Sequence, residues 1–216
     1  MLKKYDVFSD KKGMVTTMEL KNSKTRENLM KAFAGESQAR NRYTFAAAQA
    51  RQENLYVIEC IFNYTAGQEK EHAEVFYNFL SSEAGETVAI DGTYPVDIAK
   101  NTAGLLRMAQ HNEYEEHDDV YKTFAEVADS EGFSQIAAAF RMIGKVEKLH
   151  GDRFARFADM LESGKLFVAD SKVSWICLNC GHIHEGTEPP LKCPVCSHDR
   201  GYFIRLELSP FEGKYN

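Results

Sequence analysis

The 216-residue sequence predicts a mainly α protein, in which a four-helix bundle is followed by a small β/loop domain that binds metal. Four long segments repeat apolar residues at steps of three and four, which is typical of helices that bury one face. Each of these segments carries Glu or His inside its apolar stripe. Residues 175–212 lose the helical period and hold four of the five cysteines. Together these observations predict two unequal domains.

Composition excludes several classes of protein. Hydrophobic content of 44% and charged content of 27% are ordinary for a soluble globular chain, and a net charge of −6 gives no nucleic-acid footprint. No apolar run is long enough to span a membrane, and the N-terminus lacks the apolar core of a secretory signal. We therefore expect a cytoplasmic protein that binds neither membrane nor nucleic acid. In that compartment cysteines serve as metal ligands or free thiols more often than as disulfides.

The first half of the chain predicts an extension and two helices. Residues 1–20 show no clear period and are expected to form an N-terminal extension. The first helix is expected from about Ser23 to Gln52, with Ser23 or Thr25 as its N-cap. Its stripe is Leu29, Ala32, Glu36, Ala39, Tyr43, Ala46 and Ala50. The second helix is expected over 55–83, with the stripe Leu55, Ile58, Phe62, Thr65, Glu69, His72, Phe76 and Phe79.

The second half repeats this layout after a connection. Residues 84–95 contain two glycines and a proline, which indicates a long loop. A third helix is expected over 101–130 and a fourth from about 133 to 163, separated by a short break at Glu131-Gly132. The stripe of the third is Leu106, Ala109, Glu113, Glu116, Val120, Thr123 and Val127. That of the fourth is Phe133, Ile136, Phe140, Ile143, Glu147, His150, Phe154, Phe157 and Leu161.

A weak internal repeat relates the two halves. Glu36 and Glu69 are 33 residues apart, and Glu113 and Glu147 are 34 apart. Each half is thus a helical hairpin with Glu on its first helix and Glu-x-x-His on its second. Two such hairpins about a pseudo-twofold axis place these side chains at one level of a bundle. We expect the bundle to span residues 21–165, and a linker with the second domain to span 166–216.

Seven side chains in these stripes are candidate metal ligands. Buried unpaired carboxylates cost on the order of tens of kcal/mol in the idealised limit, so a cation is expected between the helices. A lone Glu-x-x-His is usually solvated surface, but here two copies coincide with apolar stripes. Carboxylate and imidazole together suit iron or manganese, and the arrangement is the one described for ferritin-like di-iron proteins. The candidates are Glu36, Glu69, His72, Glu113, Glu116, Glu147 and His150, whereas Glu71, Glu74 and Glu115 step off the stripe and are expected in solvent.

The cysteines predict a second metal site. Cys177-Leu-Asn-Cys180 and Cys193-Pro-Val-Cys196 are separated by twelve residues, a spacing typical of tetrahedral sites. On spacing alone zinc and iron fit equally. Four thiolates complete a tetrahedron, so His182 and His184 are expected on the surface. The fifth cysteine, Cys60, lies off the ligand stripe and is expected to be a buried thiol.

The motifs together resemble those of the rubrerythrin family. The residues that carry the resemblance are Glu36-Ser-Gln-Ala-Arg40, Glu69-x-x-His72, Glu113-x-x-Glu116 and Glu147-x-x-His150. Near the cysteines, Trp175, Gly181, Glu185-Gly186 and Pro189-Pro190 resemble a rubredoxin domain. The resemblance runs from about Lys21 to the end of the sequence. Ser197 stands where that domain usually has glycine, so a slightly altered backbone turn is expected there.

The resemblance implies metals and residue roles. It implies two irons bound by the seven Glu and His candidates, and one iron bound by Cys177, Cys180, Cys193 and Cys196. It also implies a redox-linked exchange in which one iron swaps Glu116 for His72. Tyr43 and Tyr121 match family tyrosines that donate hydrogen bonds near the cluster. The alternative is that both are plain core aromatics.

The resemblance also implies a reaction. The di-iron site of this family reduces hydrogen peroxide to water in oxidative-stress defence, with electrons relayed through the four-cysteine iron. The donor is a reduced rubredoxin or an NAD(P)H-dependent flavin reductase. A head-to-tail homodimer is implied, in which one subunit's cysteine centre approaches the other's di-iron site. Ferroxidase or oxygen-reductase chemistry at the same site is the alternative enzyme. A metal-storage or structural scaffold with a colourless zinc ribbon is the alternative of another class.

Overall fold

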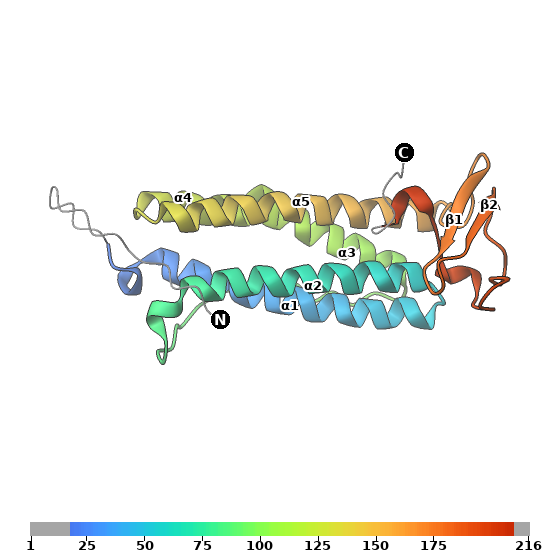
Figure 1. Cartoon of the computed structure of the whole chain (residues 1–216). Coiled ribbons are helices and arrows are strands. Elements are labelled where there is room, and N and C mark those ends of the chain that lie inside the picture. The colour runs from blue at the N-terminus through green and yellow to red at the C-terminus, as the bar shows by residue number, and fades with distance from the viewer. Residues whose placement is uncertain (1–17, 210–216) are drawn as a thin grey trace.

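The computed structural model describes residues 18–209, and most of them lie in one elongated helical bundle with a small β domain at one end (Figure 1). The helices are α1 (Lys24–Gln52), α2 (Tyr56–Phe79), α3 (Thr102–Glu115), α4 (Tyr121–Ser130) and α5 (Ser134–Glu162). The predicted fold class is therefore confirmed. The N-terminal extension expected over 1–20 lies mostly outside the described residues. No helix within 18–209 is both long and apolar enough to cross a membrane.

The start of α1 is capped from two directions. The Ser23 side chain accepts from the Arg26 backbone N–H at 3.1 Å, which makes Ser23 the N-cap. The Glu131 carboxylate, from the turn between α4 and α5, accepts from the backbone N–H groups of Lys24 and Thr25, each at 2.8 Å. These acceptors satisfy N–H groups that a helix leaves free in its first turn. The contact also ties the first hairpin to the second.

The third predicted helix is interrupted, which corrects the expected unbroken segment 101–130. A five-residue π-helical segment, Glu116–Val120, separates α3 from α4. A π turn takes up one extra residue, so the buried face moves by one position beyond it. Tyr121, Ala125 and Ala128 are buried there, in place of the predicted Val120, Thr123 and Val127. The predicted second helix also ends earlier, at Phe79, and is followed by a 3₁₀ turn at Ser81–Glu83.

The connection between the hairpins packs along α1. Residues 84–101 contain neither helix nor strand. The Tyr94 hydroxyl donates to the Lys31 carbonyl at 3.1 Å, and the Lys31 ammonium pairs with Asp91 at 2.9 Å. These contacts hold the long loop against the bundle.

Two apolar clusters fill the bundle and leave a polar layer between them. One lies toward the β domain and includes Tyr43, Phe62, Leu106 and Phe154. The other lies toward the opposite end and includes Leu29, Phe76, Tyr121 and Phe140. On α1, α2, α3 and α5 the predicted Glu and His ligands fall between members of the two clusters. The ligand layer is thus sealed from both ends by packed hydrocarbon.

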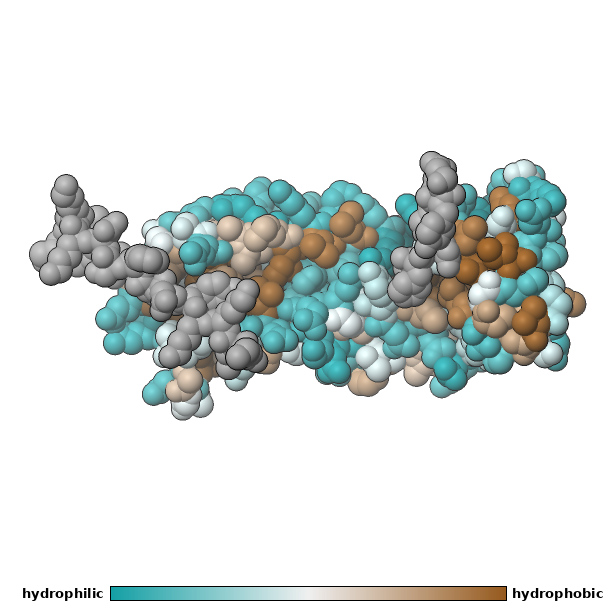
Figure 2. Space-filling view, viewed as in Figure 1, coloured by the Kyte–Doolittle hydropathy of each residue, from teal (hydrophilic) through white to brown (hydrophobic). Residues whose placement is uncertain are grey.

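The small domain is a three-stranded antiparallel sheet with long loops. Its strands are β1 (Val173–Cys177), β2 (Ile183–Gly186) and β3 (Phe203–Arg205), in the order β2-β1-β3. Trp175 is fully buried in its core, and its indole N–H donates to the Gly186 carbonyl at 3.0 Å. The domain packs on the end of the bundle, where the rings of Tyr56 and Tyr202 stack at 4.0 Å. Figure 2 shows a mostly hydrophilic surface with apolar residues gathered at this end and along the bundle.

Candidate metal centres

Six of the seven predicted ligands converge at one level of the bundle. They form two overlapping groups, each with ligand atoms within 4.8 Å of one another. One group is Glu36, Glu69, His72 and Glu147, and the other is Glu69, Glu113, Glu147 and His150. Glu69 and Glu147 belong to both, so these two would be shared between two metals, and each remaining residue would hold one metal. The internal repeat predicted from the sequence therefore produces a site with matching halves.

The two histidines face opposite oxygens of the shared carboxylates. His72 Nδ1 lies 2.9 Å from Glu147 Oε1 and 3.1 Å from Glu69 Oε2. His150 Nδ1 lies 2.8 Å from Glu147 Oε2 and 2.9 Å from Glu69 Oε1. The rings stack with centroids 5.6 Å apart. Each Nδ1 thus points at the space that the two carboxylates enclose.

The polar atoms that line this space are better suited to bind metal ions than to form hydrogen bonds with one another. Several are buried and have no hydrogen-bond partner among the described residues. These atoms are Glu36 Oε2, Glu69 Oε1, Glu113 Oε2, both Glu147 oxygens and His150 Nδ1. A buried polar atom without a partner costs about 1–3 kcal/mol, and more when it is charged. Two cations bound by these lone pairs would remove that cost.

The pKa values of the buried carboxylates and histidines also indicate a site that needs positive charge. Burial, together with the neighbouring carboxylates, raises the pKa of Glu36 and of Glu113 well above the usual range. Burial also opposes the charged form of Glu69, but its contacts with His150 and His72 outweigh this and lower its pKa to about 2. For His150 burial is likewise outweighed, by contacts with Glu113, Glu147 and Glu69, and its pKa rises to about 12. Without metal, the site therefore needs protons to offset its excess of carboxylates.

Two buried tyrosines orient the terminal carboxylates. The Tyr121 hydroxyl donates to Glu36 Oε1, and the Tyr43 hydroxyl donates to Glu113 Oε1. In both carboxylates this leaves Oε2 free, and each Oε2 is one of the unpartnered atoms. Burial raises the pKa of both hydroxyls well above the usual value, so they remain donors. Each tyrosine therefore leaves one carboxylate oxygen facing a histidine of the candidate site, Glu36 Oε2 toward His72 and Glu113 Oε2 toward His150, in addition to packing in the core.

Glu116 is the predicted ligand that the structure leaves outside both groups. It is the first residue of the π segment, is half-buried and lines a cavity of about 340 Å³ together with Tyr94, Asn112 and Tyr121. Burial and the nearby Glu113 raise its pKa well above the usual range. The off-stripe residues Glu71, Glu74 and Glu115 are exposed, as expected.

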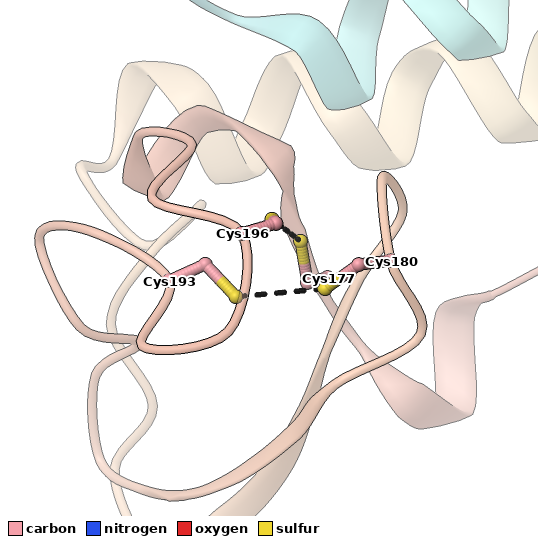
Figure 3. Close-up of side chains that lie close together, drawn as sticks. All are labelled: Cys177, Cys180, Cys193 and Cys196. Carbon is pink, nitrogen blue, oxygen red and sulfur yellow. Dashed lines mark hydrogen bonds between the residues drawn. The ribbon is translucent and has the colours of Figure 1, made fainter.

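The four cysteines form the second centre at the far end of the chain (Figure 3). Cys177 and Cys196 Sγ lie 3.8 Å apart, and Cys180 and Cys193 Sγ lie 3.6 Å apart. Metal–sulfur bonds of about 2.3 Å in a tetrahedron require sulfurs about 3.8 Å apart, so the thiols fit one ion. A backbone N–H from His198 lowers the pKa of Cys196 to about 6, which favours the thiolate that a metal requires.

The two cysteine loops close with the same kind of hydrogen bond, so Ser197 does not disrupt its loop. Gly181 has φ 77° and its N–H donates to the Cys177 carbonyl at 2.8 Å. Ser197 has φ 61° and its N–H donates to the Cys193 carbonyl at 2.9 Å. Serine adopts this left-handed conformation at a cost, because its Cβ crowds the backbone. The closing hydrogen bond to the Cys193 carbonyl stabilises it there.

The fifth cysteine and two histidines lie outside the candidate metal groups of the described residues. Cys60 is exposed, not buried. It lies two residues, or about 200°, around α2 from both Ile58 and Phe62, which face the core. His182 and His184 are half-buried and stay outside the sulfur group.

Sequence reasoning missed one pair of polar residues beside the di-metal site. Gln68 and Arg153 form a hydrogen-bonded chain to His150. A signal existed, because Arg153 follows His150 by three residues and therefore shares its helix face.

The centres are far apart within one chain. Helix α2 begins at Tyr56, which stacks on Tyr202 of the β domain, and reaches the ligand layer at Glu69. At 1.5 Å per residue these thirteen residues span about 20 Å.

Known proteins share both parts of this structure. Residues 27–158 match the Rubrerythrin family model, and residues 175–204 match the model for the rubrerythrin rubredoxin-like domain. The chain is 51% identical to rubrerythrin of Clostridium perfringens, over 85% of this chain and 95% of that protein. It is 40% identical to rubrerythrin of Nitratidesulfovibrio vulgaris, over 88% and 98% of the two chains. The solved structure of fully reduced, all-ferrous nigerythrin covers 93% of this chain and 100% of its own, with a TM-score of 0.58 and 27% identity.

The matched regions contain the ligand layer and the four cysteines, so the likeness includes the residues that would hold metal. The chain belongs to the rubrerythrin family, with its di-iron carboxylate site and its rubredoxin-like four-cysteine iron site.

Proposed function

We propose that this protein is a non-haem di-iron peroxidase that reduces hydrogen peroxide to water in oxidative-stress defence. The observation that carries the proposal is the pairing of two unlike centres in one chain. Four cysteines occupy all the coordination positions of a tetrahedral metal ion. No position is then open to a substrate, so that centre can only pass electrons. Each half of the carboxylate site would hold a metal with two shared Glu, one further Glu and one His, a set that would leave room for a small oxidant. Peroxide, two electrons and two protons give two waters.

When bound, the di-iron centre supplies the two electrons that cleave the O–O bond. The chain's own residues hold that centre and control access to it. We propose all seven predicted Glu and His residues as iron ligands, with Tyr43 and Tyr121 fixing the terminal carboxylates. His72 faces the site while Glu116 faces the adjacent cavity, which supports the proposal that these two residues exchange as ligands.

The length of α2 between the β domain and the ligand layer, about 20 Å from Tyr56 to Glu69, supports a head-to-tail homodimer. In such a dimer one subunit's cysteine centre lies near the partner's di-iron site, and electrons need not cross the length of a subunit. We propose a reduced rubredoxin or an NAD(P)H-dependent flavin reductase as donor, in the cytoplasm. Electron transfer that stays fast in an engineered monomer would count against the dimer.

The first test is anaerobic stopped-flow. Fully reduced protein is mixed with hydrogen peroxide, and the red absorbance of the ferric cysteine centre is followed. We expect it to return much faster with peroxide than with dissolved oxygen. A faster return with oxygen would instead assign oxygen-reductase or ferroxidase chemistry. An iron-replete sample without red colour would indicate a zinc ribbon and remove the electron relay.

A further inference from the structure

We propose that Arg153 is a positioning residue which, through Gln68, fixes the nitrogen that His150 presents to the metal. The inference rests on the assignment of His150 as a metal ligand, and it holds whatever oxidant the site reduces. Arg153 and Gln68 belong to α5 and α2, the two helices that also provide both Glu-x-x-His pairs. Neither side chain belongs to the ligand groups themselves.

The donor and acceptor chemistry of three side chains leaves one arrangement. Arg153 Nη1 lies 3.1 Å from the oxygen of the Gln68 amide. A guanidinium has donors only, so the amide atom that faces it must be the carbonyl oxygen. The same oxygen lies 3.1 Å from His150 Nε2, and an acceptor there requires Nε2 to carry the proton. In neutral His150 the lone pair is then on Nδ1, the atom that faces Glu147 and Glu69.

Arg153 is itself held in place. The same Nη1 donates to Thr65 Oγ1 at 2.8 Å, and Thr65 is fully buried. The Thr65 hydroxyl donates to the Ile61 carbonyl at 3.0 Å, so its oxygen is available only as an acceptor for Arg153. The guanidinium also lies 5.1 Å from the centre of the Tyr64 ring, a cation–π distance. The amide cannot flip without placing its NH₂ group against both a guanidinium and an imidazole N–H.

This hydrogen-bonded chain from Arg153 through Gln68 reaches only one of the two histidines, His150. His150 is fully buried, whereas the His72 side chain is 12% exposed. Within residues 18–209, no protein group forms a hydrogen bond to His72 Nε2. The histidine proposed to exchange with Glu116 is thus held by protein groups only through Nδ1, whereas His150 is held through both ring nitrogens. A group that sets the tautomer of a ligand histidine commonly changes metal affinity about 10–100-fold when it is removed.

The test compares four forms of the full-length protein loaded anaerobically with iron(II): wild type, Arg153→Met, Gln68→Leu and Arg156→Met. Arg156 is exposed on the same helix and serves as the matched control. Proton NMR detects the His150 Nε2–H as a paramagnetically shifted resonance that exchanges with D₂O. We expect slow exchange in wild type and Arg156→Met, fast exchange in Arg153→Met, and rapid exchange or loss in Gln68→Leu. The iron(II) affinity of the bundle site should fall about 10–100-fold in Arg153→Met and in Gln68→Leu.

A rescue separates positioning from packing. A carboxylate accepts through both oxygens and needs no partner to orient it. Adding Gln68→Glu to Arg153→Met should therefore restore slow exchange and most of the iron affinity. Failure of the rescue would show that Arg153 acts by packing, and wild-type exchange in Arg153→Met would also overturn the proposal. If Arg153→Met does not fold, Arg153→Lys replaces it, with faster exchange expected and unchanged exchange contradicting the proposal. None of these readouts needs turnover, so they stand apart from the peroxidase test.

Discussion

The Tyr121 hydroxyl donates a hydrogen bond to Glu36 Oε1 from the opposite hairpin, and both side chains are almost fully buried. Tyr121 can do this only because the π segment Glu116–Val120 turns it toward the core. The bond leaves Glu36 Oε2 as the atom that faces the metal site. Backbone irregularity, second-hairpin packing and ligand orientation are thus linked through one residue.

Tyr121→Phe should destabilise the iron-loaded protein by about 1.5–3 kcal/mol, the usual contribution of a hydrogen bond to a charged group. The ring and its packing against Phe76 and Phe140 remain, so only the hydroxyl is tested. The free energy of unfolding is measured by anaerobic denaturant titration. Tyr77→Phe is the control, because Tyr77 is 55% exposed and its change should stay within about 0.5 kcal/mol. If both variants lost the same free energy of unfolding, the Tyr121 hydrogen bond to Glu36 would contribute nothing to stability.

Most of the ligand layer could be predicted from the sequence because apolar and ligand residues share one period. Steps of three and four set Glu36, Glu69 and Glu147 on buried faces, and the structure brings them together. The cysteine site could be predicted from the sequence as well, because its ligands lie close together along the chain. Local pattern sufficed wherever the backbone stayed regular.

The π segment shows where local pattern fails. Residues 116–120 contain no glycine or proline to mark an irregular turn, and regular periodicity therefore placed Val120 in the core. Comparison of motifs with a known family pointed instead to Tyr121, which the structure buries. The Gln68 contact with His150 joins residues 82 apart, and no period along one helix predicts it.

Glu147→Ala should remove the bundle iron and abolish turnover while leaving the cysteine iron in place. Both Glu147 oxygens are unpartnered ligand atoms, and the residue belongs to both ligand groups, so neither metal keeps a full set. Iron content and the visible spectrum of the cysteine centre are measured on the same sample. Glu126→Ala, at an exposed position on α4, should change neither. Full peroxidase activity in Glu147→Ala would refute the assignment of the site.

The metal-free bundle should lose stability as pH rises from about 5 to 9. Burial raises the folded pKa of Glu36, Glu113 and Glu116, so above pH 4.5 the unfolded chain releases protons that the folded chain keeps. His72 has a folded pKa of about 9, raised by Glu147 and Glu69 although burial opposes this, and its contribution is lost as pH rises toward that value. The lowered pKa of Glu69, about 2, acts in the opposite direction, but only below pH 4.5.

Helical circular dichroism during thermal unfolding measures this dependence. The iron-loaded protein is the control, because bound metal replaces the protons and should flatten the curve. A metal-free midpoint that stays level or rises between pH 5 and 9 would contradict the proposed charge balance.

Gly201→Ala should loosen the β domain from the bundle without harming either metal site. A Cβ at Gly201 would lie 1.9 Å from the Asn54 carbonyl oxygen, in the turn between α1 and α2, so the two domains must separate locally. Overpacking of this kind costs about 1–3 kcal/mol. We expect faster proteolysis in the connection 163–172 and an earlier first transition on heating, with the red cysteine centre retained. Gly67→Ala is the matched control, because Gly67 is at an exposed position of α2 and a Cβ there meets nothing within 4 Å. Alanine also favours a helix over glycine by about 0.5–1 kcal/mol. The two glycine variants should therefore move stability in opposite directions, and a shift in the same direction would show that the Gly201 contact does not hold the domains together.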